Sequence, residues 1–129
     1  MENATRKVRP KYLDLLRLTL PATGWVSIAH RISGVVLVLF IPFVLYGLDV
    51  ASTDPAGFVR VQLWCKSFPG NFFVFVGVLS LAHHLLAGAR FLLLDAHIGA
   101  ELAQARRVAR MILLADGVFM VVLAALLLL

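Results

Sequence analysis

The chain has 129 residues, of which 61% are hydrophobic and 15% are charged, and its formal net charge is +5. A soluble domain would carry roughly 25% charged residues, so this composition excludes an ordinary soluble domain. The basic residues follow membrane topology instead of forming a nucleic-acid-binding surface, and we expect no nucleic-acid partner. We therefore expect a single all-α domain over residues 1–129, embedded in membrane lipid.

The first element in chain order is a short N-terminal segment. Residues 10–21 mix leucines with charges and end in proline, a pattern typical of a segment lying on the membrane interface. We expect Thr23 or Ser27 to cap or enter the following helix. That helix is predicted to span the membrane over 24–50, with Pro42 inside it as a candidate kink.

Two further membrane spans are predicted. The loop at 49–70 contains Ser-Thr-Asp-Pro and Phe-Pro-Gly, both of which are turn signals, and we expect one helical turn at 58–64. The second span is predicted at 68–95 and the third at 108–129, since each apolar stretch is close to the length that crosses a bilayer. A segment at 95–110, which we expect to form a short polar helical turn, joins them.

Basic residues are distributed unevenly around these spans. Six of the twelve Lys and Arg residues precede or open the first span, and four flank the second loop; the two in the first loop are offset by Asp49 and Asp54. The positive-inside rule then places the N-terminus in the cytoplasm and the C-terminus in the periplasm. We see no cleavable signal or transit peptide, which favours a multi-pass protein of a bacterial inner membrane.

Polar residues cluster where the first span begins. Ser27, His30, Arg31 and Gly34 are spaced i, i+3, i+4 and i+7, so they share one stripe of a helix. A hydroxyl and a guanidinium there would donate to a carbonyl or carboxylate with little competition from water. Gly34 would let a flat ligand or another helix approach closely. The alternative is that Arg31 reaches the headgroups and His30 is merely interfacial.

A second polar cluster lies in the second span. The neutral imidazole of His84 is of the kind that binds haem iron, and Gly88 would leave room for a porphyrin face beside it. Arg90 and Arg31 would neutralise haem propionates. His83 projects about 100° away around the helix and cannot share the ligand role. The alternative is that His84 is an interhelical hydrogen-bond donor.

Other polar residues carry simpler expectations. Asp116, in the third span, is expected to reach the headgroups or to pair with an arginine at the inner face. His97 is expected to be solvated in a loop. Tyr46 and Trp64 fit an aromatic belt at the outer interface.

Two runs of sequence resemble a known family. Residues 27–34 read SIAHRISG, and residues 84–95 read His-x-x-x-Gly-x-Arg-x-x-x-x-Asp. Together with Arg-Pro at 9–10, Tyr-Leu-Asp-Leu at 12–15 and three spans, they resemble the cytochrome b subunit of succinate dehydrogenase. This is the membrane anchor of respiratory complex II in its bacterial form.

The resemblance implies a set of partners and sites. Such an anchor holds a flavoprotein subunit and an iron–sulfur subunit at the membrane and packs with a second small hydrophobic anchor around a shared haem b. Succinate is oxidised on the partner subunits, and the electrons reduce ubiquinone near the cytoplasmic face. The residues implied are Ser27, Arg31 and Ile28 for quinone binding, His30, Arg31 and Arg90 for the haem propionates, and His84 as axial ligand of the haem iron.

Two alternatives stay open at this point. One is the anchor of a fumarate reductase-type complex, since sequence does not fix the physiological direction, and the other is a haem-free structural membrane subunit. A transporter subunit is disfavoured because no inverted helical repeat is apparent. The chain also departs from the family pattern at Phe91, where some relatives have a second histidine, and the roles of His83 and Asp116 are not part of that pattern.

Overall fold

The computed structural model describes residues 20–128, and every regular element within them is an α-helix. In chain order the helices are α1 (Ala22–Thr53), α2 (Pro55–Lys66), α3 (Phe68–Asp95) and α4 (Leu102–Leu128). The three longer helices are each long and apolar enough to cross a bilayer. The expected all-α membrane architecture is therefore confirmed. The predicted interfacial segment at 10–21 lies almost entirely outside the described residues.

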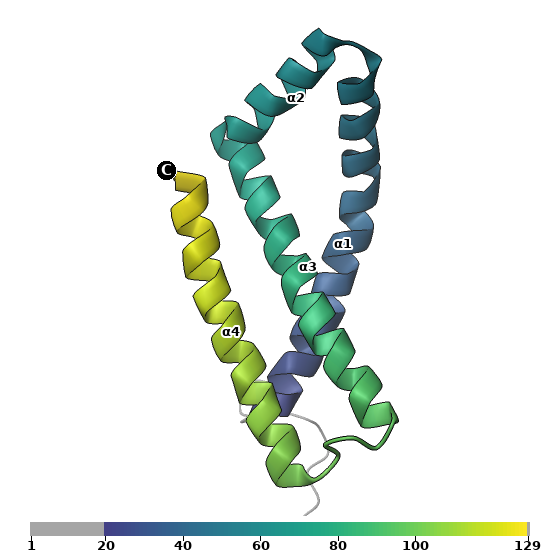
Figure 1. Cartoon of the computed structure of the whole chain (residues 1–129), viewed down its shortest axis with the longest axis vertical. Coiled ribbons are helices and arrows are strands. Elements are labelled where there is room, and N and C mark those ends of the chain that lie inside the picture. The colour runs from purple at the N-terminus through teal and green to yellow at the C-terminus, as the bar shows by residue number, and fades with distance from the viewer. Residues whose placement is uncertain (1–19, 129) are drawn as a thin grey trace, which may run out of the picture.

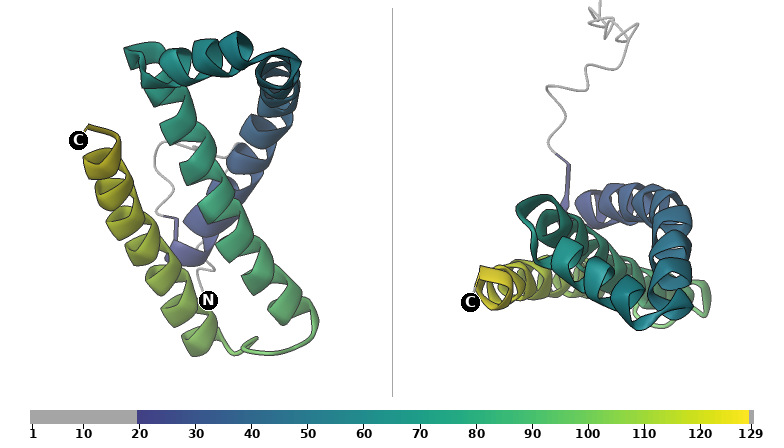
Figure 2. Two further views of the ribbon diagram at one scale, coloured as in Figure 1. Left: turned by 45° about the horizontal axis from the view of Figure 1, so that its top comes forward. Right: turned by 90° about the horizontal axis from the view of Figure 1, so that it is seen from above.

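The helices α1, α2 and α3 form a triangle. α1 and α3 cross in the half of the molecule that is farther from α2 and diverge toward the end where α2 joins them (Figure 1). α4 runs beside α3 in the opposite direction (Figures 1 and 2). The side-chain amide of Asn71, at the start of α3, donates to the carbonyl of Leu127 at 2.7 Å and so fixes the end of α4. We call the two ends of the molecule the crossing end and the α2 end.

α2 and α3 begin with similar caps. The carboxylate of Asp54 accepts from the backbone N–H of Gly57, and the hydroxyl of Ser67 accepts from that of Gly70 at 3.3 Å. A proline follows within the first two helical positions, where its missing N–H is not needed. The single turn expected at 58–64 is therefore part of a 12-residue helix.

α1 and α4 begin differently from our predictions. Pro21 precedes α1 in extended backbone without a side-chain cap, so Thr23 and Ser27 both lie inside the helix, as one of the two expectations had it, and neither caps it. α4 starts at Leu102, before the predicted start of the third span at 108, so most of the segment expected to form a short helical turn belongs to this long helix. Alanine favours helix more than leucine does, arginine favours it about as much as leucine does, and arginines near the end of a membrane helix reach water easily.

α1 changes direction along its length (Figure 1), and Pro42 lies inside it. A proline has no N–H to donate to the carbonyl of Val38, and its ring crowds that turn of the helix. Kinks of this kind are a usual effect of proline. The proline thus accounts for a bend in the part of α1 that diverges from α3.

The buried core is small and lies at the crossing end. It consists of a few apolar side chains, which are Val26, Ala87, Ala109 and Ile112. The alanines let α3 and α4 approach each other closely, as small residues do in membrane helices. Most of the large apolar side chains elsewhere are exposed, so they are available to lipid or to other protein chains.

Candidate functional site

The crossing of α1 and α3 is built around two stacked imidazoles. The ring centroids of His30 on α1 and His84 on α3 lie 4.1 Å apart, and the ring planes differ by 12°. The ring of Phe91, two turns along α3 from His84, packs edge-on against His30 at 5.2 Å. The two histidines that the sequence placed on separate spans therefore form one cluster.

Each imidazole lies over a glycine of the opposite helix. A Cβ added at Gly34 would lie 3.1 Å from Cε1 of His84, and one added at Gly88 would lie 3.4 Å from Nε2 of His30. Both helices thus carry the same His-x-x-x-Gly pattern, and the histidine of each helix packs on the glycine of the other. This signal is present in the sequence. We expected the glycines to admit a flat ligand or a helix, whereas imidazoles of the chain itself occupy both positions.

Hydrogen bonds fix the tautomer of His84. The hydroxyl of Ser33 donates to the carbonyl of His30 at 2.9 Å, and Nδ1 of His84 lies 3.2 Å from both of these oxygens. A carbonyl only accepts, and the single hydrogen of the hydroxyl is already used, so Nδ1 of His84 must carry a hydrogen and donate it.

His84 therefore keeps one nitrogen for another partner. In the neutral ring Nε2 holds the lone pair, and a hydrogen bond at the other nitrogen is the usual way in which a metal-binding histidine is oriented. The alternative prediction that His84 is an interhelical donor is confirmed for Nδ1. Nε2 has no hydrogen-bond partner among the described residues, so the two roles are compatible.

An apolar cavity of about 670 Å³ lies between α1 and α3 and includes His84 at its edge. His84 is the one polar residue among those that line it. The rings of Phe40 and Phe73 stack at 4.0 Å on its walls, and Gly77 makes room for them, since a Cβ there would lie 2.6 Å from Phe40. The cavity thus offers apolar walls with a single imidazole.

The neighbouring histidine faces the other way. Nδ1 of His83 donates to Oδ2 of Asp116 on α4 at 2.6 Å, and the side chains are 10% and 16% exposed. The predicted divergence of His83 and His84 is confirmed. The prediction that Asp116 reaches the headgroups or pairs with an arginine was wrong. Arg110, the nearest arginine in sequence on α4, is six residues away and lies on a different face of the helix.

Arg90 belongs to the interface between α3 and α4. It lies two turns from His83 on the same face and is only 6% exposed. Its guanidinium donates to the carbonyl of Ala105 at 3.4 Å, and its Nε has no partner among the described residues. Its role toward haem propionates stays a prediction, and the structure adds that its side chain packs toward α4.

The three residues expected to bind quinone lie on one flank of α1. Ser27 is half-buried, Arg31 is exposed and Ile28 is 37% exposed. None of them lines the cavity between α1 and α3. They lie next to the stripe of α1 that packs against the other helices, so this flank is accessible to a further chain.

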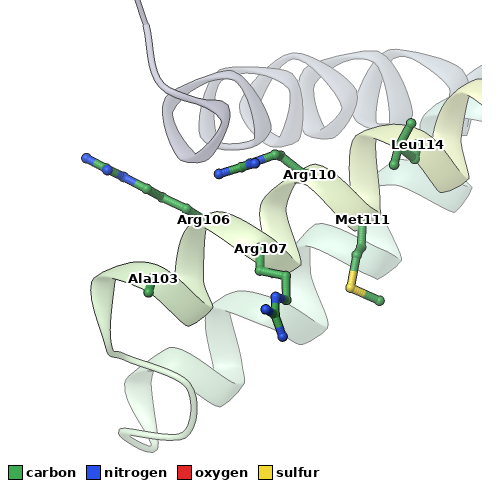
Figure 3. A pocket seen from close by; sticks show the side chains of 6 residues that line it. All are labelled: Ala103, Arg106, Arg107, Arg110, Met111 and Leu114. Carbon is green, nitrogen blue, oxygen red and sulfur yellow. The ribbon is translucent and has the colours of Figure 1, made fainter.

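Basic residues surround the start of α4. A shallow pocket of about 520 Å³ opens between arginine and apolar side chains (Figure 3), which belong to Ala103, Arg106, Arg107, Arg110, Met111 and Leu114. The side chains of Arg106 and Arg110 extend to one side of the helix and that of Arg107 to another (Figure 3). Such a basic rim at the crossing end is typical of the cytoplasmic end of a membrane protein. His97, in the loop before α4, is exposed as expected.

Comparison with known proteins identifies the family of this chain. Residues 5–127 match the family described as succinate dehydrogenase/fumarate reductase transmembrane subunit. The chain is 34% identical over 107 residues to the succinate dehydrogenase cytochrome b556 subunit of Paracoccus denitrificans, covering 83% of this chain and 82% of that protein. It is 35% identical over 88 residues to the subunit of the same name from Coxiella burnetii (strain RSA 493 / Nine Mile phase I), covering 67% and 70%. The chain therefore belongs to the family of succinate dehydrogenase/fumarate reductase transmembrane subunits.

Proposed function

We propose that this chain is the haem b-binding anchor of a succinate:quinone oxidoreductase in a bacterial inner membrane. The observation that carries the proposal is the pair of hydrogen bonds at Nδ1 of His84, which leaves Nε2 as a metal-binding nitrogen. Both relatives are named as cytochrome b556 subunits, and membership of the same family supports haem b in this chain.

The residues around His84 suit a haem ligand. The stack with His30 and the two acceptors at Nδ1 hold the ring before any ligand arrives, so little ordering is needed on binding. The apolar lining beside His84 is of the kind that accommodates the face of a large ring. A bound haem b would supply a one-electron carrier, with its second axial ligand from the partner anchor. His83 is unsuited to this role because its Nε2 is buried and its side chain does not line the apolar cavity between α1 and α3.

Basic groups near His84 would hold the haem carboxylates. His30 stacks directly on His84, and Arg31 follows it in the chain, so both lie at the level of the ligand. Arg90 has a buried Nε without a partner and a long hydrogen bond to Ala105. A buried donor without an acceptor is unfavourable, and a propionate oxygen would satisfy it.

The quinone site would use the flank of α1. Ser27 and Arg31 are one turn apart, so a hydroxyl and a guanidinium both donate toward a carbonyl oxygen of ubiquinone. Donors in a water-poor site stabilise the negative charge that develops on this oxygen during reduction. Ile28 would form an apolar wall. Because these side chains are partly or largely exposed, we infer that a partner chain closes the pocket and supplies protons.

The small core also argues for partner chains. The buried apolar residues are few, while large apolar side chains are exposed along all three membrane helices. We propose that a second small hydrophobic anchor packs on this surface. The iron–sulfur subunit and the flavoprotein subunit would dock at the crossing end, and succinate would be oxidised on the flavoprotein.

A difference spectrum tests the haem proposal. The whole complex, purified in mild detergent, should show a b-type band when the reduced-minus-oxidised spectrum is recorded. His84→Ala should lose this band, whereas His83→Ala should keep it. An intact complex without the band would support the haem-free alternative, and the reverse pattern of the two variants would show that the ligand was assigned wrongly.

Paired activity assays test the quinone proposal. Ser27→Ala or Arg31→Ala should lower ubiquinone reduction about tenfold or more, which corresponds to about 1.4 kcal/mol per factor of ten. Reduction of a soluble dye by succinate should persist, because it needs only the partner subunits. Ser80→Ala, which changes a half-buried serine of α3, is the matched control. Equal loss of both activities would contradict a specific quinone role.

A further inference from the structure

A buried polar pair joins α3 to α4 and has no role in the function proposed above. We call His83 and Asp116 the interhelical pair. The pair lies near the middle of both helices, with 2.6 Å between Nδ1 and Oδ2. Nε2 of His83 and Oδ1 of Asp116 are buried without partners among the described residues. Polar groups are costly at this depth of a membrane, so their presence calls for a physical reason.

The geometry of α3 connects the interhelical pair with His84. His83 and His84 are consecutive, so their side chains leave the helix about 100° apart on one rigid turn of backbone. His83 bonds to α4, and His84 bonds to Ser33 and the His30 carbonyl on α1. The same turn of α3 is therefore held from two directions, and any rotation of the helix about its axis must move both imidazoles.

The other contacts between α3 and α4 near this turn have little directional preference. Ala87, Ala109 and Ile112 pack without polar bonds, and small apolar surfaces resist rotation weakly. The bond from Arg90 to Ala105 is long, at 3.4 Å. The interhelical pair is thus the short directional bond that opposes rotation of α3 beside α4 at the level of His84.

We propose that the interhelical pair positions the haem ligand. It holds α3 at the rotation about its own axis in which Nε2 of His84 faces the haem iron. This proposal rests on the proposed function, because it assigns the pair a purpose only if His84 binds haem iron. A site of this kind tolerates an error of only about 10–20° or 0.5 Å in the direction of a ligand. His83 and Asp116 are positioning residues and do not themselves touch the haem.

Spectroscopy of the whole complex tests the positioning role. The g values of an oxidised low-spin haem depend on how its axial imidazole is oriented, so they report position independently of activity. Asp116→Leu should keep one haem per complex but shift the electron paramagnetic resonance spectrum, and Asp116→Asn, which keeps an acceptor oxygen, should restore it. The double variant His83→Leu/Asp116→Leu removes both polar groups without burying an unpaired one, and should also assemble and show the shift.

A control variant separates positioning from general helix packing. Asn71→Ala also removes a bond between α3 and α4, but at the α2 end, away from His84. It should lower the thermal midpoint of the complex while leaving the haem spectrum unchanged. An unshifted spectrum in both leucine variants, or the same shift in Asn71→Ala, would overturn the positioning role.

The His84→Ala variant, measured in parallel, distinguishes the two proposals. If it loses the haem while the leucine variants keep an unshifted spectrum, only the positioning role fails. If it keeps the haem, or if the unaltered complex holds none, the proposed function fails and the positioning role fails with it.

Discussion

The contact between Gly34 and His84 yields a quantitative prediction. In Gly34→Ala the new Cβ would lie 3.1 Å from Cε1 of His84, whereas carbon atoms pack best at about 3.5–4.0 Å, so the ring must move by roughly 0.4–0.9 Å. The ring is already held by the stack with His30 and by the acceptors at Nδ1. Overpacking of this kind costs about 1–3 kcal/mol, and the better helix propensity of alanine offsets about 1 kcal/mol. We expect a net loss of stability of up to about 2 kcal/mol.

A graded series of alanine variants provides the assay. Gly88→Ala brings a Cβ to 3.4 Å from His30, which is close to ordinary contact, and Gly117→Ala on α4 meets nothing within 4 Å. The thermal midpoint of the detergent-solubilised complex should therefore fall most for Gly34→Ala, less for Gly88→Ala, and not at all for Gly117→Ala. Haem content should follow the same order. If Gly34→Ala behaves like Gly117→Ala, the described packing of His84 against α1 is wrong.

Three further predictions concern stability away from the imidazoles. Gly77→Ala should lower the thermal midpoint, because its Cβ would lie 2.6 Å from the stacked ring of Phe40. Asn71→Leu should destabilise by about 0.6 kcal/mol, the average for hydrogen bonds between membrane helices, and by at most about 1.7 kcal/mol, and should speed proteolysis of the end of α4. Asp54→Ala should cost about 0.5–2 kcal/mol through the lost cap, seen as faster hydrogen exchange in α2.

Matched controls accompany these variants. Gly47→Ala on α1 meets nothing within 4 Å and should leave the midpoint unchanged or raise it slightly. Asp49→Ala removes a carboxylate near the same loop without removing a cap, so hydrogen exchange in α2 should stay as it is. Equal effects of Asp49→Ala and Asp54→Ala would argue for a charge effect in place of capping.

The sequence was most informative about features that depend on a single helix. Apolar length alone predicted three membrane helices, because a backbone in lipid must satisfy its own hydrogen bonds. Helical spacing alone predicted that His83 and His84 diverge, which the bond from His83 to Asp116 confirms. The start of α4 was predicted too late. Residues 102–110 form helix because of the intrinsic helix propensity of residues such as arginine, and not because of an apolar run.

The sequence was less informative where two helices must meet. The stack of His30 on His84 depends on where α1 and α3 cross, and no local pattern states which residues lie at that point. The repeated His-x-x-x-Gly pattern was a usable signal. It predicts that each histidine packs on the other helix's glycine only once α1 and α3 are known to be antiparallel. Asp116 was expected to reach the headgroups or to pair with an arginine at the inner face, whereas its partner is His83 on another helix. The assignments of Ser27, Ile28 and Arg31 to quinone stay predictions.

The triangular course of the first three helices has a mechanical consequence. The 12 residues of α2, at about 1.5 Å each, make a strut of roughly 18 Å. Helices in direct contact lie about 8–10 Å apart, so the strut keeps the far ends of α1 and α3 separated by nearly twice that distance. The length of α2 therefore sets how far α1 and α3 are separated at the α2 end. Deleting one turn of α2 would bring the far ends of α1 and α3 closer together, while the stack of His30 on His84 at their crossing stayed in place.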